Sequence, residues 1–144
     1  MATFDVHFQL LSEAEQTVSG GRVFSFGFTT ALGVKGPQKL VNRWLKCLCT
    51  LKGTDLLSPT YGTGFPELIG SNVSQQQDVI DAMALFIEDC NDQITAFDQK
   101  KFPPQDERLA SAVLTSVIPR GDSDYDIYVA MKNAAGVVLN VKVP

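Results

Sequence analysis

The chain has little of what catalytic and metal sites are built from. Of its 144 residues one is histidine, His7, and three are cysteine, Cys47, Cys49 and Cys90. A nucleophile–base pair would need His7 beside a thiol or hydroxyl, and no motif brings it there. Cys47 and Cys49 lie about 200° apart around a helix axis, which suits neither a mutual disulfide nor a metal chelate. We therefore predict buried free thiols, no catalytic residues, no metal, no cofactor and no enzymatic activity.

Long apolar runs and a surplus of basic residues are also missing. No run approaches the roughly 20 residues of a membrane-spanning helix, and the alternating N-terminus is unlike a signal peptide. Twelve Lys and Arg stand against 16 Asp and Glu, a formal net charge of −4, whereas phosphate binding needs a cationic face. We expect neither a membrane nor nucleic acid as partner, and a protein of the cytoplasm or of a particle assembled there.

What is present begins with residues that alternate between apolar and polar. Residues 3–11 read TFDVHFQLL and place Phe4, Val6 and Phe8 on one face. After a Ser-Gly-Gly turn at residues 19–21, phenylalanines recur at positions 24, 26 and 28. A period of two is typical of half-buried strands. We predict that residues 1–30 hold two strands, which pair as a hairpin or with other strands.

Two amphipathic helices are predicted in the middle of the chain, over residues 37–50 and 74–100. The first begins with proline, tolerated in the first turn, and its apolar stripe includes Trp44. The second is predicted to begin with a capping box formed by Ser74 and Gln77. The apolar stripe of the second helix, which includes the aromatic residues Phe86 and Phe97, is predicted to lie in the core. Trp44 of the first helix is predicted to lie there as well.

Residues 51–73, between these helices, are rich in Gly, Pro, Ser and Thr and predict a loop that packs as a rigid connector. Residues 108–144 contain three further strand patterns separated by turns, which predict an antiparallel meander. The predicted fold class is α+β: one domain over residues 1–144, with two main helices on an antiparallel sheet, an N-terminal strand pair and a C-terminal three-strand meander.

The second helix carries an acidic stripe, Asp81, Glu88 and Asp92, opposite its apolar one. The stripe admits three interpretations: a solvated face, a surface for a basic partner, or, with Asp89, an acid/base pair for glycan cleavage. Helical spacing puts most of these carboxylates on the solvent side, which favours the first two.

Two turn motifs follow the first helix, Thr50-Leu51-Lys52-Gly53 and Pro59-Thr60-Tyr61-Gly62, and both turns are expected to need glycine at positive φ. An apolar helix, a Thr-x-x-Gly turn, a Pro-x-aromatic-Gly element, a long helix and a β-meander occur here in that order. This order resembles the baseplate wedge and sheath-initiator family of contractile phage tails and related injection machines, some members of which carry a lysozyme label. The family's Glu-Pro-Arg triplet corresponds to Glu88-Asp89-Cys90, so only the glutamate is kept.

The resemblance implies a structural protein of the virion, in the tail baseplate, that joins wedge and tube proteins to the first ring of sheath protein. Six copies per particle, assembled in the host cytoplasm, are expected. Sheath subunits of such tails exchange terminal strands, so the partner-binding candidates are the two terminal strands and one motif. These residues are Val137, Leu139, Val141 and Val143, then Phe4, Val6 and Phe8, and then Tyr61 and Gly62. The alternative is a small regulatory protein-binding module of the same fold, which would use Asp81, Glu88 and Asp92.

Overall fold

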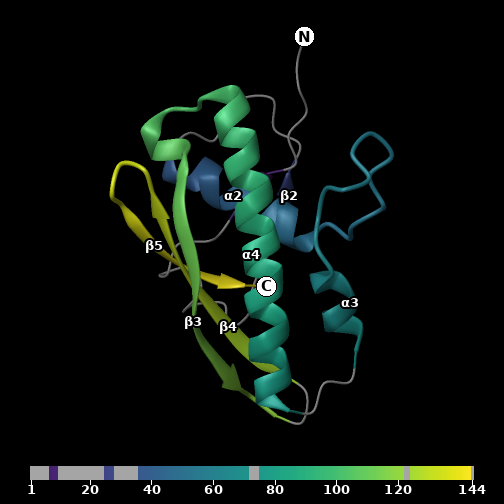
Figure 1. The fold of residues 1–144 in the computed structure, drawn as a ribbon. Coiled ribbons are helices and arrows are strands. Elements are labelled where there is room, and N and C mark those ends of the chain that lie inside the picture. The colour runs from purple at the N-terminus through teal and green to yellow at the C-terminus, as the bar shows by residue number, and fades with distance from the viewer. Residues whose placement is uncertain (1–6, 10–24, 28–35, 72–74, 122–123, 144) are drawn as a thin grey trace.

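A three-stranded antiparallel sheet forms one layer of the protein in the computed structural model, which describes residues 7–9, 25–27, 36–71, 75–121 and 124–143. The strands are β3 (Leu109–Pro119), β4 (Tyr125–Asn133) and β5 (Val138–Val143), in the order β3-β4-β5 (Figure 1). β4 is the central strand, and β3 and β5 are its two neighbours in the sheet. The C-terminal meander and the mixed α+β class agree with the sequence prediction.

Two helices, α2 (Pro37–Cys49) and α4 (Gln76–Lys101), form the second layer (Figure 1). α4 packs along β3, and α2 contacts α4, β4 and β5. The core between the layers is apolar, and Trp44 is completely buried in it, as predicted. Its other fully buried members include Leu40, Leu45, Leu48, Met83, Val129 and Met131. No helix among the described residues is long and apolar enough to cross a membrane.

Two details of α4 differ from the sequence prediction. The residue that caps the helix is Gln75, without a side-chain hydrogen bond, and Ser74, predicted as the capping residue, lies outside the described residues. The amide Nε2 of Gln77 donates instead to Asp81 Oδ1, one turn along the helix, at 2.9 Å. Phe97, assigned to the core, is instead 45% exposed, and the Arg43 guanidinium carbon lies 5.1 Å from the centroid of its ring.

The connector predicted as loop over residues 51–73 contains a short helix, α3 (Phe65–Gly70). Pro66 in the first turn fixes a helical φ, which explains why a segment rich in turn formers still makes a helical turn here. The Phe65 side chain is buried and anchors α3 against the core, whereas Ile69 faces solvent. The connector is thus packed only in part: residues 61–66 are buried or half-buried, as predicted, whereas residues 52–60 are mostly exposed.

At the N-terminus the described residues are two short strands, β1 (His7–Gln9) and β2 (Ser25–Gly27), which pair antiparallel with Phe8 opposite Phe26. A turn of 3-10 helix, η1 (Gln105–Glu107), links α4 to β3. Of the predicted N-terminal partner-binding residues, Phe4 and Val6 lie outside the described residues, and only the backbone of Phe8 is described.

Candidate protein-interaction site

The first of the two turn motifs that follow α2 binds Thr63, the residue directly after the second motif, through the backbone. Thr63 N donates to Thr50 O at 2.9 Å, and Lys52 N donates to Thr63 O at 3.2 Å. The buried Thr63 hydroxyl donates to Leu48 O at 2.7 Å and accepts from Phe65 N at 3.2 Å. The end of α2, the connector and the start of α3 are therefore tied into one structural unit, which we call the clamp (residues 48–52 and 61–65).

Gln93 of α4 fixes this clamp to the second layer. Its carbonyl Oε1 accepts from Gly62 N at 3.0 Å, and its Nε2 donates to Gly62 O at 2.8 Å and to Asp89 Oδ1 at 3.0 Å. Gly62 has φ of 105° and Gly53 has φ of 91°, which confirms the positive φ predicted for both motif glycines. At Gly62 there is a second reason for glycine, because a Cβ there would overlap the Thr50 carbonyl oxygen.

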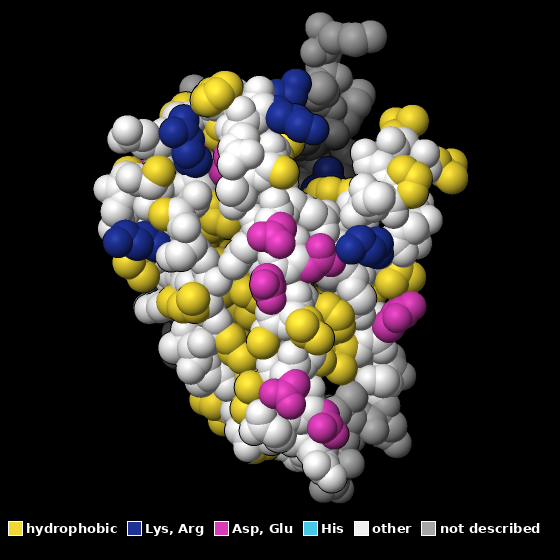
Figure 2. Space-filling view, viewed as in Figure 1, with side chains coloured by type: hydrophobic (Ala, Val, Ile, Leu, Met, Phe, Trp, Pro, Cys, Tyr) yellow, Lys and Arg dark blue, Asp and Glu magenta, His cyan; other side chains and the backbone are white. Residues whose placement is uncertain are grey.

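Between the two halves of the clamp the chain makes a loop, residues 54–60, that carries Leu56 and Leu57 at 94% and 95% exposure. The Asp55 carboxylate holds the tip, because its Oδ1 accepts from Leu57 N at 2.9 Å and from Ser58 N at 3.3 Å. Figure 2 shows hydrophobic surface at the end of this loop, at the upper right of the view. This site was not predicted from the sequence, where its signal is two adjacent leucines inside a segment of turn-forming residues.

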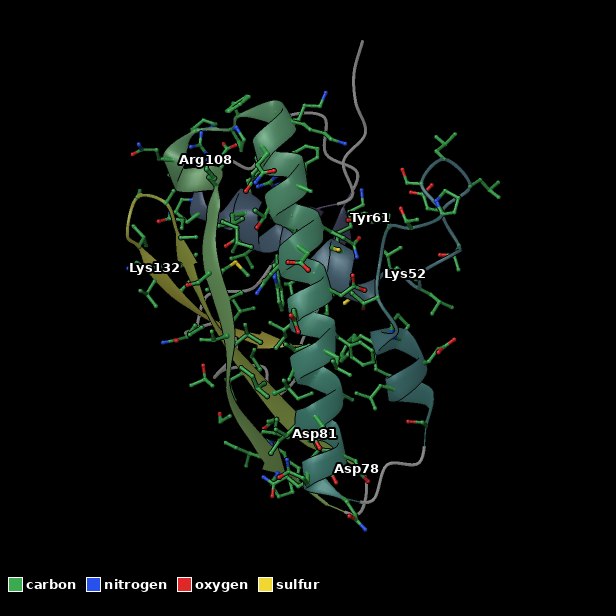
Figure 3. All side chains as sticks on the ribbon, in the orientation of Figure 1. Lys52, Tyr61, Asp78, Asp81, Arg108 and Lys132 are labelled. Atoms are coloured by element: carbon green, nitrogen blue, oxygen red, sulfur yellow. The ribbon has the colours of Figure 1, made fainter. Side chains whose placement is uncertain are left out.

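Tyr61 and Lys52, at the base of the loop, lie on the side of α4 away from the sheet (Figure 3). Tyr61 is half-buried, and burial is the main cause that raises the pKa of its hydroxyl above the ordinary value. Lys52 Nζ donates to Asp89 Oδ2 at 2.9 Å. Tyr61 and Gly62 were predicted to contact a partner protein. In the structure they contact other residues of this chain, and they position the loop that carries the exposed leucines.

The acidic stripe does not act as one unit. Asp81, Glu88 and Asp92 are all exposed, but Asp81 lies near the start of α4, beside Asp78 (Figure 3). Glu88 and Asp92 instead border a shallow groove of about 340 Å³ between α4 and β3. The groove is lined by Ala84, Ile87, Glu88, Asn91, Asp92, Ala112, Val113 and Leu114.

β5, the predicted partner strand, is last in the sheet order, with β4 as its neighbour. Most of its apolar side chains, predicted to bind a partner, are not accessible to one. Val141 and Val143 are 3% and 1% exposed and belong to the protein's own core, because odd-numbered positions of β5 face the helices; Leu139 is half-buried. Val137 precedes the strand and is exposed. A partner strand would therefore contact the backbone of β5 rather than these valines.

The remaining polar clusters stabilise the fold. Arg43 Nη1 donates to the buried Asp98 Oδ1 at 2.9 Å, and Asp98 Oδ2 accepts from Leu109 N at 2.9 Å. All three cysteines are free thiols, as predicted; Cys47 and Cys90 are buried, and burial raises the pKa of the half-buried Cys49 to about 11. Among the described residues, no group of three or more His, Cys, Asp and Glu side chains is placed to hold a metal ion.

Comparison with protein-family models, with curated proteins and with solved structures gives no match for this chain.

Proposed function

We propose that this chain is a structural component of a contractile-tail baseplate, which joins wedge and tube proteins to the first sheath ring and initiates sheath assembly. One observation carries the proposal. The clamp contains parts of both motifs that resemble the baseplate family, and the loop between its two halves carries two leucines that are almost fully exposed. The motif residues thus support a projecting contact element, as an assembly protein requires.

Leu56 and Leu57 offer apolar surface that a partner can bury. Burying one leucine side chain contributes about 1.5–3 kcal/mol, so a partner that covers both would gain roughly 3–6 kcal/mol. Asp55 and the clamp already order the loop, so less conformational entropy is lost on binding. Two apolar side chains held together on an ordered loop therefore favour a protein-binding role.

Strand pairing at the sheet edge is the second part of the proposal. β5 offers backbone groups of residues 138–142 to a neighbouring chain, in the mode called β-augmentation. The N-terminal strand pair, with β1 and β2 as its described parts, is proposed as the other pairing element. Proline at Leu139 or Val141 would also disturb the protein's own core, so Asn140→Pro, at an exposed position, is the cleaner test of pairing at the edge.

The test is electron microscopy of particles assembled with the wild type, without the chain, and with the double variant Leu56→Ser, Leu57→Ser. We expect sheathless baseplates or bare tubes in the last two cases. The variant should unfold within about 0.5 kcal/mol of the wild type, because neither leucine is packed. The matched control is Leu85→Ser with Ile118→Ser, which also removes two exposed apolar side chains. Normal sheathed tails without the chain would refute the function, and normal tails with the loop variant would refute the role of the loop.

A second candidate function is a small regulatory module that binds a basic partner through the acidic face of α4. The observation that favours it is the position of Glu88 and Asp92 on the rim of an apolar groove. If tails assemble normally without the chain, this candidate replaces the first. Triple substitution of Asp81, Glu88 and Asp92 to Lys should then weaken partner binding, with a loss that depends on salt.

A further inference from the structure

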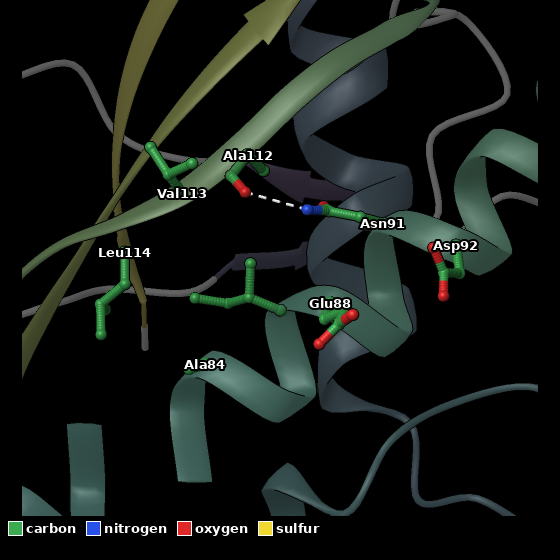
Figure 4. A pocket seen from close by; sticks show the side chains of 8 residues that line it. Ala84, Glu88, Asn91, Asp92, Ala112, Val113 and Leu114 are labelled. Atoms are coloured by element: carbon green, nitrogen blue, oxygen red, sulfur yellow. Dashed lines mark hydrogen bonds between the residues drawn. The ribbon is translucent and has the colours of Figure 1, made fainter. Parts of the chain in front are cut away.

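We infer that the groove between α4 and β3 binds a short segment of a partner protein in which an apolar side chain is flanked by lysine or arginine. This surface is distinct from the loop with Leu56 and Leu57, so the inference is independent of the baseplate role; it deepens the second candidate function by naming the chemistry of the partner segment. Figure 4 shows the groove, with Glu88 and Asp92 on α4 and Val113 and Leu114 on β3.

The side chains at the base of the groove are apolar. Ala84 and Ile87 line it from α4, and Ala112 and Leu114 line it from β3. Ala84 is exposed, and its small side chain leaves room beside the strand. A volume of about 340 Å³ suits one or two side chains of a partner better than a whole helix. The base therefore selects an apolar side chain of moderate size.

The charges on the rim are the second feature. Glu88 and Asp92 are one helical turn apart, and like charges at this spacing destabilise a helix by about 0.2–0.5 kcal/mol. Among the described residues no cation pairs with either of them, whereas Asp89 binds Lys52 and Asp98 binds Arg43. In Figure 2 acidic side chains lie over α4 next to hydrophobic surface. A partner with cationic side chains beside its apolar one complements both features.

The edge of β3 restricts how this partner binds. The carbonyl of Ala112 accepts from Asn91 Nδ2 at 2.9 Å, and the carbonyl of Val117 accepts from Gln76 Nε2 at 2.6 Å. These amides already occupy backbone acceptors that an added strand would need. Recognition at the groove therefore uses side chains and not a β-ladder, which separates it from the strand pairing proposed at β5.

The experiment is an NMR titration of the ¹⁵N-labelled chain with a synthetic peptide of alternating lysine and leucine. Two control peptides replace every leucine by glycine or every lysine by glutamate. We expect shifts of the amides of Ala84, Glu88 and Ala112 with the first peptide alone, weaker at high salt. Shifts elsewhere, equal binding of the glycine peptide, or no shift at millimolar peptide would overturn the inference.

Matched variants isolate the two features of the groove. Glu88→Lys with Asp92→Lys should lower the affinity at least about tenfold, because like charges then face the peptide. Glu67→Lys with Asp124→Lys changes the net charge equally, at exposed positions outside the groove lining, and should change the affinity less than about twofold.

Ala84→Gln should fill the groove and weaken binding, whereas Ala96→Gln, at an exposed position of the same helix outside the groove, should not. Equal losses from the two charge variants would mean that any acidic surface suffices, and would refute the site. The oligomeric state of the chain without peptide, measured by analytical ultracentrifugation, decides whether a second copy occupies the groove. Self-association that Ala84→Gln abolishes would overturn the partner assignment.

Discussion

Replacing Gly62 by alanine tests the clamp that the structure places at the centre of the candidate site. Gly62 has φ of 105°, and an added Cβ would overlap the Thr50 carbonyl oxygen and lie 3.0 Å from the Thr50 carbonyl carbon. Because both contacts are backbone atoms, the side chain cannot be accommodated by a change of rotamer. The connector must move away from the end of α2, and the hydrogen bonds from Thr63 N and Lys52 N are then lost.

The magnitude follows from these separate contributions. A non-glycine residue at positive φ costs roughly 1–2 kcal/mol, and each of the two lost hydrogen bonds costs about 1 kcal/mol. We therefore expect Gly62→Ala to lower the free energy of unfolding by about 3–4 kcal/mol. Gly53→Ala is the matched control: φ is 91° there, but nothing lies within 4 Å of the added Cβ. Gly53→Ala should therefore lower the free energy of unfolding only by the roughly 1–2 kcal/mol that positive φ costs a non-glycine residue.

The assay is urea unfolding of both variants and the wild type, followed by far-ultraviolet circular dichroism. A difference of about 2 kcal/mol between the two variants is expected, well above the error of the midpoint comparison. If Gly62→Ala and Gly53→Ala destabilise the chain equally, within about 0.5 kcal/mol, the close approach of Gly62 to Thr50 does not contribute to stability. The proposed role of the clamp hydrogen bonds would then be wrong.

Two other predictions concern charged groups. Asp98→Ala leaves Arg43 partly buried without its carboxylate partner and should lower the free energy of thermal unfolding by about 3–5 kcal/mol. Lys52→Met breaks an exposed ion pair and should lower it by less than about 1 kcal/mol. Equal losses from the two variants would mean that the buried pair contributes no more to stability than the exposed one. Burial alone would raise the pKa of the Glu107 carboxyl, but hydrogen bonds from Lys39 and from Gly36 N outweigh it and hold the pKa below its ordinary value of 4.5. Glu107 therefore stabilises the fold above pH 4.5, and this stability should be lost as the pH falls through the lowered pKa. Glu107→Gln should flatten the acid limb of unfolding free energy against pH, and an unchanged limb would contradict the assignment.

The sequence by itself determined the elements whose signal is local. Helical spacing located α2 and α4 to within a few residues, and alternation located the three strands of the meander, because side-chain direction follows the backbone period. The conformations of Gly53 and Gly62 were also predictable, since only glycine adopts positive φ at low cost. Residues 65–70 were misassigned because turn formers concealed a helix of six residues.

Only the tertiary structure decided which of these residues are free to bind a partner. Glu88, Asp89 and Asp92 look alike in the sequence, yet Lys52 reaches Asp89 from 37 residues away, and the other two border the groove. Phe97 has helical spacing for the core, but it is partly exposed and its ring contacts Arg43 of another helix. Pairing and burial depend on contacts between segments distant in sequence, which periodicity does not encode.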